Sequence, residues 1–270
     1  MRRGRLLLTV GAAVAAAVAI AIVLAFAGAS QGEEDPLLPD LDQAEPGQLS
    51  GRTVTVRGVP RFFLGFASAA GNIGDGPLAI VGSRDSAQQA EMDVVQRIVR
   101  EDGSTRDVPV DAKLRYVTSS DHAHWHMLDF MTYELRRADG TLVAPDRKTG
   151  FCLGDRYELR LPLGAAEPEP FFVQECGKGQ RGLLTLGEGI SVGWGDDYDA
   201  HLEGQNFDIT GLPAGEYLLV HRVNEKRVLQ ETDYSNNASS MAFRLDWPDG
   251  MQRPPRVDVI NRCRDSATCS

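Results

Sequence analysis

Alternating apolar and polar residues are the main pattern along the chain beyond residue 50. Residues 53–57 alternate, residues 77–81 form a short apolar run after a Gly-Asp-Gly turn, and residues 93–100 lead into a Glu-Asp-Gly-Ser turn. A period of two sends successive side chains to opposite faces, as in a strand of a sheet with one buried face. These segments are therefore expected to be short strands joined by turns.

The same pattern continues in the second half of the chain. Residues 130–136 alternate and end at an Ala-Asp-Gly turn, which is a hairpin signal. Residues 212–217 turn into the apolar stretch 218–223, and residues 241–245 close the series. Because no segment of this region shows a convincing amphipathic helix, the sequence predicts a mainly β protein, an antiparallel β-sandwich with long functional loops.

The N-terminus carries a different pattern, which indicates export. Arg2, Arg3 and Arg5 precede an uninterrupted apolar run over residues 6–27. A basic head followed by an apolar core is typical of a signal peptide, and a run of this length also suffices for a membrane anchor. Residues 1–30 are therefore assigned to a signal peptide or an N-terminal anchor. Either form places the protein outside the cell, secreted or held at the outer face of the plasma membrane, with membrane contact only through this segment.

Residues 31–47 are acidic and contain prolines, which favours a linker. The whole chain has a formal net charge of −10. Such a surface repels nucleic acids and other polyanions and attracts cationic molecules. A nucleic-acid partner is therefore not expected.

Four cysteines form an even set in a chain that we expect to be exported. Disulfides are then favoured over free thiols or a thiolate zinc site. Three connectivities are possible, and we predict the pairs Cys152–Cys176 and Cys263–Cys269. The second pair would clip residues 247–270 into a C-terminal tail.

Three of the five histidines, His122, His124 and His126, lie in the motif Asp-His-Ala-His-Trp-His. On a strand they share one face at a spacing of about 6 to 7 Å, which favours metal binding. The alternative is a strand with three polar residues facing water, where lysine, glutamate or threonine is far more common. Imidazole suits zinc, copper, iron or nickel, and three imidazoles leave an open position for chemistry.

These histidines begin a series of ordered motifs that resembles the catalytic domain of the lysyl oxidases. The motifs are His122-Ala-His-Trp-His126 with Asp129 and Phe130, Lys148-Thr-Gly-Phe-Cys-Leu-Gly-Asp155, Gly189-Ile-Ser-Val-Gly-Trp-Gly-Asp-Asp-Tyr198, Gln205-Asn-Phe-Asp-Ile-Thr210, Pro213-Ala-Gly-Glu-Tyr217 and Asp233-Tyr-Ser-Asn-Asn237. The resemblance extends from about Leu37 to Leu245 and is much more specific than the histidines alone. Residues 48–246 are accordingly assigned to a lysyl-oxidase-like catalytic domain.

The resemblance implies a copper-dependent oxidase of primary amines that builds a cofactor from its own side chains. In that family the motif histidines bind copper, which here means His122, His124 and His126. A lysine and a tyrosine are joined as lysine tyrosylquinone, and their positions match Lys148 and Tyr198. Lysine side chains or small amines are then converted with dioxygen to aldehydes, with release of ammonia and hydrogen peroxide.

The chemistry of these residue types agrees with that implication. A tyrosine ring near copper and dioxygen is oxidised to a quinone, to which a neutral lysine amine can add. Turnover also needs a base that removes a proton from the substrate, for which Asp196, Asp197 and His201 are all candidates. Asp129 is either an acceptor that orients a metal-bound histidine or a surface charge.

Some positions depart from the animal enzymes. Asp121 stands where their histidine motif has a cysteine, and the cysteines are fewer. A long basic propeptide is not expected. Gly195, Gly204 and Asn206 replace bulkier residues, so the floor of the pocket is expected to differ. These departures weaken the case for large protein substrates such as collagen.

Two other functions are compatible with the histidine motif. With zinc and an activated water, the three histidines would support a hydrolase or hydratase, in which Lys148 is an ordinary surface lysine and Tyr198 a half-buried tyrosine. A non-catalytic copper-binding protein of the cell surface would bind copper without forming a quinone. Separately, the triplet Asn237-Ala-Ser239 matches a glycosylation acceptor, a weak signal by itself.

Overall fold

The computed structural model describes residues 35–119, 123–145, 148, 150–162 and 166–270. The chain divides into a segment Met1–Glu33 and a folded unit Glu34–Ser270. The predicted signal peptide or anchor lies outside the described residues, as does His122. The described residues contain no helix that is long and apolar enough to cross a membrane.

The described residues form eighteen strands and no helix, so the prediction of a mainly β fold is confirmed. Sheet one has the order β13 (Thr185–Ile190), β6 (Leu78–Ser83), β7 (Glu91–Arg100), β8 (Thr105–Thr118) and β9 (Ala123–Met127), with β1 (Pro36–Leu37) on β7. Sheet two has the order β11 (Leu142–Pro145), β10 (Met131–Arg137), β16 (Gly215–Val223), β17 (Ala238–Asp246) and β18 (Arg256–Cys263).

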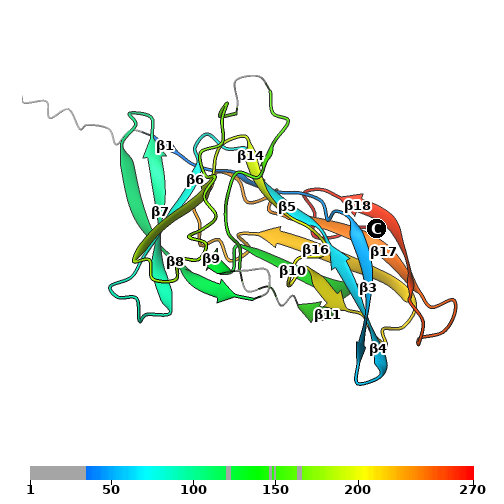
Figure 1. Cartoon of the computed structure of the whole chain (residues 1–270). Helices are drawn as coiled ribbons and strands as arrows, with labels where there is room; N and C mark the ends of the chain where they lie inside the picture. The colour runs from blue at the N-terminus through cyan, green and yellow to red at the C-terminus, as the bar shows by residue number, and fades with distance from the viewer. Residues whose placement is uncertain (1–34, 120–122, 146–147, 149, 163–165) are drawn as a thin grey trace, which may run out of the picture. The chain divides into compact units, whose positions relative to one another are not determined.

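Two smaller sheets complete the folded unit (Figure 1). Sheet three has the order β12 (Tyr157–Glu158), β14 (Trp194–Tyr198), β5 (Ser68–Asn72) and β2 (Leu41–Gln43). Sheet four has the order β15 (Asn206–Asp208), β4 (Val59–Phe66) and β3 (Leu49–Val56). The pairings are antiparallel throughout.

All four sheets contribute to one hydrophobic core. Ile80 of sheet one, Tyr133 of sheet two, Leu41 of sheet three and Phe66 of sheet four belong to the same buried cluster. The rings of Phe66 and Tyr133 meet edge to face with centroids 4.8 Å apart. Burial alternates along β10, as expected for a strand that presents one face to this core. This shared core therefore holds together the sheets that carry the candidate site residues.

The described part of the predicted linker, residues 35–47, contains two short strands. β1 and β2 lie within it, and Leu41 is completely buried. The backbone N–H of Leu41 donates to Glu231 Oε2 at 2.9 Å. Strands of two or three residues are too short to show a period of two in the sequence. They pair with the distant strands β7 and β5, so no local pattern predicts them.

The C-terminal residues 247–270 contain the strand β18. β18 pairs with β17 and forms the edge of sheet two. The predicted disulfides are both confirmed, since Cys152 is bonded to Cys176 and Cys263 to Cys269. The second disulfide therefore closes the chain end beyond an edge strand of the sheet.

Candidate active site

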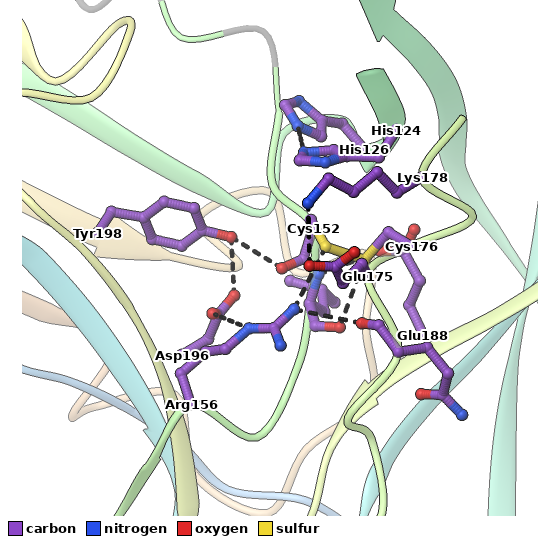
Figure 2. The surroundings of a disulfide bond; sticks show 12 residues. His124, His126, Cys152, Arg156, Glu175, Cys176, Lys178, Glu188, Asp196 and Tyr198 are labelled. Carbon is purple, nitrogen blue, oxygen red and sulfur yellow. Dashed lines mark hydrogen bonds and ion pairs between the residues drawn. A yellow bond between two sulfur atoms is a disulfide. The ribbon is translucent and has the colours of Figure 1, made fainter. Parts of the chain in front are cut away.

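The strand β9 carries two of the three motif histidines. It pairs with β8, with His124 opposite Val117 and His126 opposite Arg115. The Nε2 atoms of His124 and His126 are 2.7 Å apart, and their ring centroids are 4.7 Å apart (Figure 2). His126 is buried and His124 is partly exposed. Imidazole nitrogens are ligands that both zinc and copper accept, so these two converging residues fit as part of a metal site.

The third predicted ligand, His122, lies outside the described residues. Within the described ranges there is no group of three or more His, Cys, Asp or Glu side chains arranged to hold a metal ion. The structure therefore brings together two of the three predicted ligands.

The residue between the two histidines anchors the strand on its opposite face. Trp125 is completely buried, and its backbone N–H donates to the carbonyl oxygen of Cys176 at 2.9 Å. Its indole Nε1–H donates to the carbonyl of Gln180 at 3.2 Å, and the guanidinium of Arg84 lies 4.6 Å from its ring centroid. β9 is therefore held along both edges, which fixes the histidine side chains in place.

Tyr198 ends β14 with its ring buried against Phe151, whose centroid is 5.1 Å away in an edge-to-face contact. Its hydroxyl lies 2.8 Å from Asp196 Oδ2 and 3.0 Å from the carbonyl oxygen of Cys152. Burial and the neighbouring Asp196 carboxylate raise the pKa of Tyr198 well above its usual value. Tyr198 is thus a protonated phenol in an aromatic pocket.

Lys148 lies directly over that ring. Its Nζ is 4.6 Å from the centroid of Tyr198 and 5.1 Å from that of Phe151. The same amine donates a hydrogen bond to the carbonyl oxygen of Glu203 at 3.3 Å. The structure therefore brings together the lysine and the tyrosine that sequence reasoning singled out, although they are fifty positions apart in the chain.

Two of the glycines that depart from the animal enzymes make room for neighbouring side chains. Gly204 has φ +80°, and a Cβ there would lie 3.0 Å from Lys148 Cα. A Cβ at Gly195 would lie 2.4 Å from the ring of Tyr157. Gly204 thus lets the Lys148 backbone approach, whereas Gly195 accommodates a tyrosine of the adjacent strand.

Of the three candidate bases, Asp196 is the one whose carboxylate contacts the hydroxyl of Tyr198. It is almost completely buried on the same strand as Tyr198, and burial raises its pKa to about 8. Arg156 lies beside it, with Nε 3.8 Å from Asp196 Oδ1. Asp197 is the intervening residue on the strand and is exposed, and His201 is also exposed. Strand parity alone directs Asp196, and not Asp197, to the face of Tyr198.

Asp129 does not act as a partner of the histidines among the contacts described. Its carboxylate accepts a hydrogen bond from Lys226 Nζ at 2.8 Å, and both side chains are more than half exposed. It has φ +59°, a left-handed conformation that aspartate tolerates in turns. Of the two interpretations, a surface charge is the one that this geometry supports.

The disulfide Cys152–Cys176 lies between the histidine pair and Tyr198 (Figure 2). The carbonyl of Cys176 accepts from Trp125 on β9, and the carbonyl of Cys152 accepts from the hydroxyl of Tyr198 on β14. The disulfide therefore connects the two halves of the site. Sequence spacing predicted the pairing but not this position.

Sequence reasoning missed two charged residues of the site. Arg156 contacts Asp196 and donates to the carbonyl of Gln174 at 3.3 Å. Glu188 is buried, accepts the backbone N–H of Leu153 at 3.2 Å, and has a pKa raised well above its usual value by burial. Arg156 directly follows a matched motif, which was a usable signal, whereas nothing in the sequence marks Glu188 as buried.

Comparison with known proteins identifies the family. The family model for lysyl oxidase matches residues 82–249, a stretch that contains every described residue of the site. The chain belongs to the lysyl oxidase family.

Individual lysyl oxidase relatives are similar over about half of this chain. Lysyl oxidase homolog 2 of Gallus gallus is 31% identical over 150 residues, 55% of this chain and 17% of that protein. Lysyl oxidase homolog 3B of Danio rerio is 30% identical over 143 residues, 51% of this chain and 16% of that protein. Homolog 2 of Homo sapiens is 29% identical over 150 residues, 55% of this chain and 17% of that protein. The matched region is therefore a small part of each of these relatives.

The glycosylation triplet of this lysyl oxidase relative is buried. Asn237 is 7% exposed, and its side-chain amide donates to Glu231 Oε1 at 2.6 Å. The nitrogen that would carry a glycan is thus engaged inside the folded unit. Asn237 has a structural role in this conformation.

Proposed function

We propose that this protein is a copper-dependent amine oxidase that converts primary amines to aldehydes. The observation that carries the proposal is the position of Lys148 Nζ, 4.6 Å from the Tyr198 ring centroid, in a chain of the lysyl oxidase family. The overall reaction consumes one amine, one dioxygen and one water, and it yields one aldehyde, one ammonia and one hydrogen peroxide. Lysine side chains and small amines are the proposed substrates.

His122, His124 and His126 would hold the copper ion. The convergence of the His124 and His126 ring nitrogens supports this assignment. Copper with dioxygen would supply the oxidising power that converts the ring of Tyr198 into part of a lysine tyrosylquinone. Lys148 would provide the amine nitrogen of that cofactor.

The chain's own residues prepare Tyr198 and Lys148 for this linkage. Phe151 packs edge to face against the tyrosine ring and helps to hold it in place. The carbonyls of Cys152 and Glu203 accept hydrogen bonds from the phenol and from the lysine amine, respectively. These contacts orient the amine over the ring face before any bond forms, which is the positioning that intramolecular addition requires.

We further propose that the enzyme works outside the cell. The apolar run over residues 6–27 after three arginines favours export, either as a secreted protein or anchored at the outer membrane face. The two disulfides agree with an oxidising compartment. The net charge of −10 favours the approach of cationic amines.

Mass spectrometry of protein matured with copper and dioxygen tests the proposal. Digestion should yield a covalently linked pair of peptides bearing Lys148 and Tyr198, together with quinone absorbance and amine-dependent peroxide. Lys148→Ala and Tyr198→Phe should lose all three signals and keep copper. Copper without the linked peptides would support the carrier function, and zinc with hydrolytic activity would support a hydrolase.

A further inference from the structure

Asp196 and Tyr198 form a buried pair on one face of β14. They are two residues apart on the strand, and Asp196 is 1% exposed. The strand is fixed on both edges, because Asp196 lies opposite Ala70 of β5 and the neighbouring Gly195 lies opposite Tyr157 of β12. The carboxyl is therefore held at 2.8 Å from the phenol oxygen.

The hydrogen bonds of this pair require a second proton. The phenol oxygen of Tyr198 has one proton and two acceptor neighbours, Asp196 Oδ2 and the carbonyl of Cys152. When the carboxyl is protonated, it donates to the phenol oxygen while the phenol donates to Cys152, and both contacts are satisfied. When the carboxyl is ionised, the single proton serves only one of the two acceptors fully.

The surroundings of Asp196 favour its protonated form near neutral pH. Burial raises its pKa to about 8, and the positive charge of Arg156, 3.8 Å away, compensates only in part. The titratable and charged groups that act on Asp196 or feel its charge are Arg156, Lys148, Asp197, Tyr157, Glu188 and Tyr198. Tyr198 donates a hydrogen bond to this carboxyl at 2.8 Å.

We propose that Asp196 accepts the phenol proton of Tyr198 when the tyrosine ring is oxidised during cofactor formation. The inference rests on the proposed function. It assigns Asp196 a role in building the cofactor, a step distinct from the oxidation of substrate amines.

The balance of hydrogens in quinone formation shows why a proton acceptor is needed. Conversion of the ring to a quinone removes its O–H and one C–H hydrogen and adds one oxygen atom. One dioxygen is the oxidant: one atom enters the ring, the other leaves as water with the two hydrogens, and four electrons pass from ring to dioxygen. Addition of the Lys148 nitrogen and reoxidation use a second dioxygen, which is released as hydrogen peroxide.

In the described part of the chain, the other two groups beside the phenol are less suited to take its proton. The Cys152 carbonyl accepts a hydrogen bond but is far too weakly basic to keep the proton. The amine of Lys148 lies over the face of the ring, 4.6 Å from its centroid. Among the described contacts of the phenol, the ionised carboxylate of Asp196 is the one that combines a hydrogen bond with sufficient basicity, so formation of the cross-link should accelerate as pH rises toward 8 and level off above it.

The first test follows the cross-link over time in copper-loaded protein exposed to dioxygen. Asp196→Asn keeps the shape of the side chain but removes the proton acceptor, and we expect at least a tenfold slower appearance of linked peptides with equal copper content. Asp199→Asn is the matched control, because Asp199 is an exposed carboxylate beside Tyr198 in the sequence. Formation of the cross-link at the wild-type rate in Asp196→Asn would overturn the proposal.

The wild-type pH profile gives a second readout that does not depend on a variant folding. The rate of cross-linking should rise through pH 8, and a profile that is flat from pH 6 to 9 contradicts a role for Asp196. The Asp196→Asn protein should lose that inflection while Asp199→Asn retains it.

A third measurement separates this inference from the proposed function. If wild-type protein forms no cross-link at all, the proposed function fails, but the proton link can still be measured in metal-free protein by ultraviolet titration of tyrosine. Subtracting the titration of a matched Tyr198→Phe variant isolates the signal of Tyr198. Removal of the Asp196 charge should then lower the pKa of Tyr198, and an unchanged titration would overturn the link between the two groups.

Discussion

At the scale of single residues, burial decides which polar groups have unusual chemistry. His221 is completely buried, with the rings of Tyr133 and Phe66 at centroid distances of 4.6 and 5.0 Å. Among the described residues, neither of its ring nitrogens has a hydrogen-bond partner, and burial lowers its pKa to about 3. The folded protein therefore holds this imidazole neutral across the physiological range.

This burial predicts an acid-sensitive fold. The unfolded chain binds a proton at His221 below its ordinary pKa of 6.5, whereas the folded chain does so only below about 3. Stability is then fully present above pH 6.5 and falls between 6.5 and 3, by at most about 1.4 kcal/mol per pH unit. Urea unfolding at pH 7 and pH 5 should show a smaller pH difference for His221→Leu than for wild type. The exposed control His201→Gln should behave as wild type, and an equal slope in all three proteins would contradict the prediction.

A glycine beside the site gives a second prediction at this scale. Gly204→Ala places a Cβ 3.0 Å from Lys148 Cα at φ +80°, so it should reduce the yield of Lys148–Tyr198 cross-link several-fold and destabilise the fold by about 1 to 2 kcal/mol. Gly103→Ala is the matched control, because Gly103 has φ +79° and nothing within 4 Å of the added Cβ. Chemical unfolding and peptide mass spectrometry should show a similar stability loss in both variants but a cross-linking defect in Gly204→Ala alone.

At the scale of elements, the site depends on β9 and β14 belonging to different sheets that one disulfide connects. β9 lies at the edge of sheet one and β14 lies within sheet three. The backbone N–H of Trp125 donates a hydrogen bond to the carbonyl of Cys176, and the hydroxyl of Tyr198 donates one to the carbonyl of Cys152. The relative position of the histidines and the tyrosine is thus supported by packing and by this disulfide, which makes one hydrogen bond to each strand.

Removal of this disulfide should therefore affect both stability and metal binding. The joint substitution Cys152→Ala and Cys176→Ala opens a loop with a sequence separation of 24 and should cost about 3 kcal/mol in unfolding free energy. Copper affinity, measured by competition with a chelator, should fall because β9 loses an anchor.

The second disulfide provides the control for that experiment. Cys263 and Cys269 are separated by 6 positions, and Cys269 packs with Leu218 and Val220 in a small cluster apart from the main core. Their removal should cost about 2 kcal/mol and leave copper affinity unchanged. Equal losses of copper affinity in the two double variants would contradict a specific role for Cys152–Cys176.

At the scale of the whole molecule, charge is the property that bears on substrate access. The formal net charge of −10 gives a negative field that attracts amines in their cationic form. We expect kcat/KM for a diamine to fall as salt is raised from low to physiological ionic strength, with a steeper fall than for a monoamine of similar length. Peroxide release measured for both substrates checks this expectation, and salt-independent rates would show that the field does not guide substrate.

Sequence periodicity predicted the mainly β class and most of the long strands, because a period of two is a local property of each segment. The histidine spacing likewise indicates a metal-binding face on any extended strand. Lys148 and Tyr198 were identified only through the resemblance to the lysyl oxidases, since no local pattern separates them from an ordinary surface lysine and a buried tyrosine.

The sequence by itself therefore determined part of the strand pattern and the candidate ligands, because these features depend on spacing along the chain, and it favoured the cysteine pairs that the structure contains. Only the tertiary structure decided that β1 and β2 join the fold, that Lys148 lies over Tyr198, and that Asp196 contacts the phenol. The strand pairings and the contact of Lys148 with Tyr198 join segments far apart in the chain, and the contact of Asp196 with Tyr198 depends on the burial of β14, so each of them depends on the whole core. The same reason explains why neither Glu188 nor His221 was recognisable as a buried ionisable group before the fold was known.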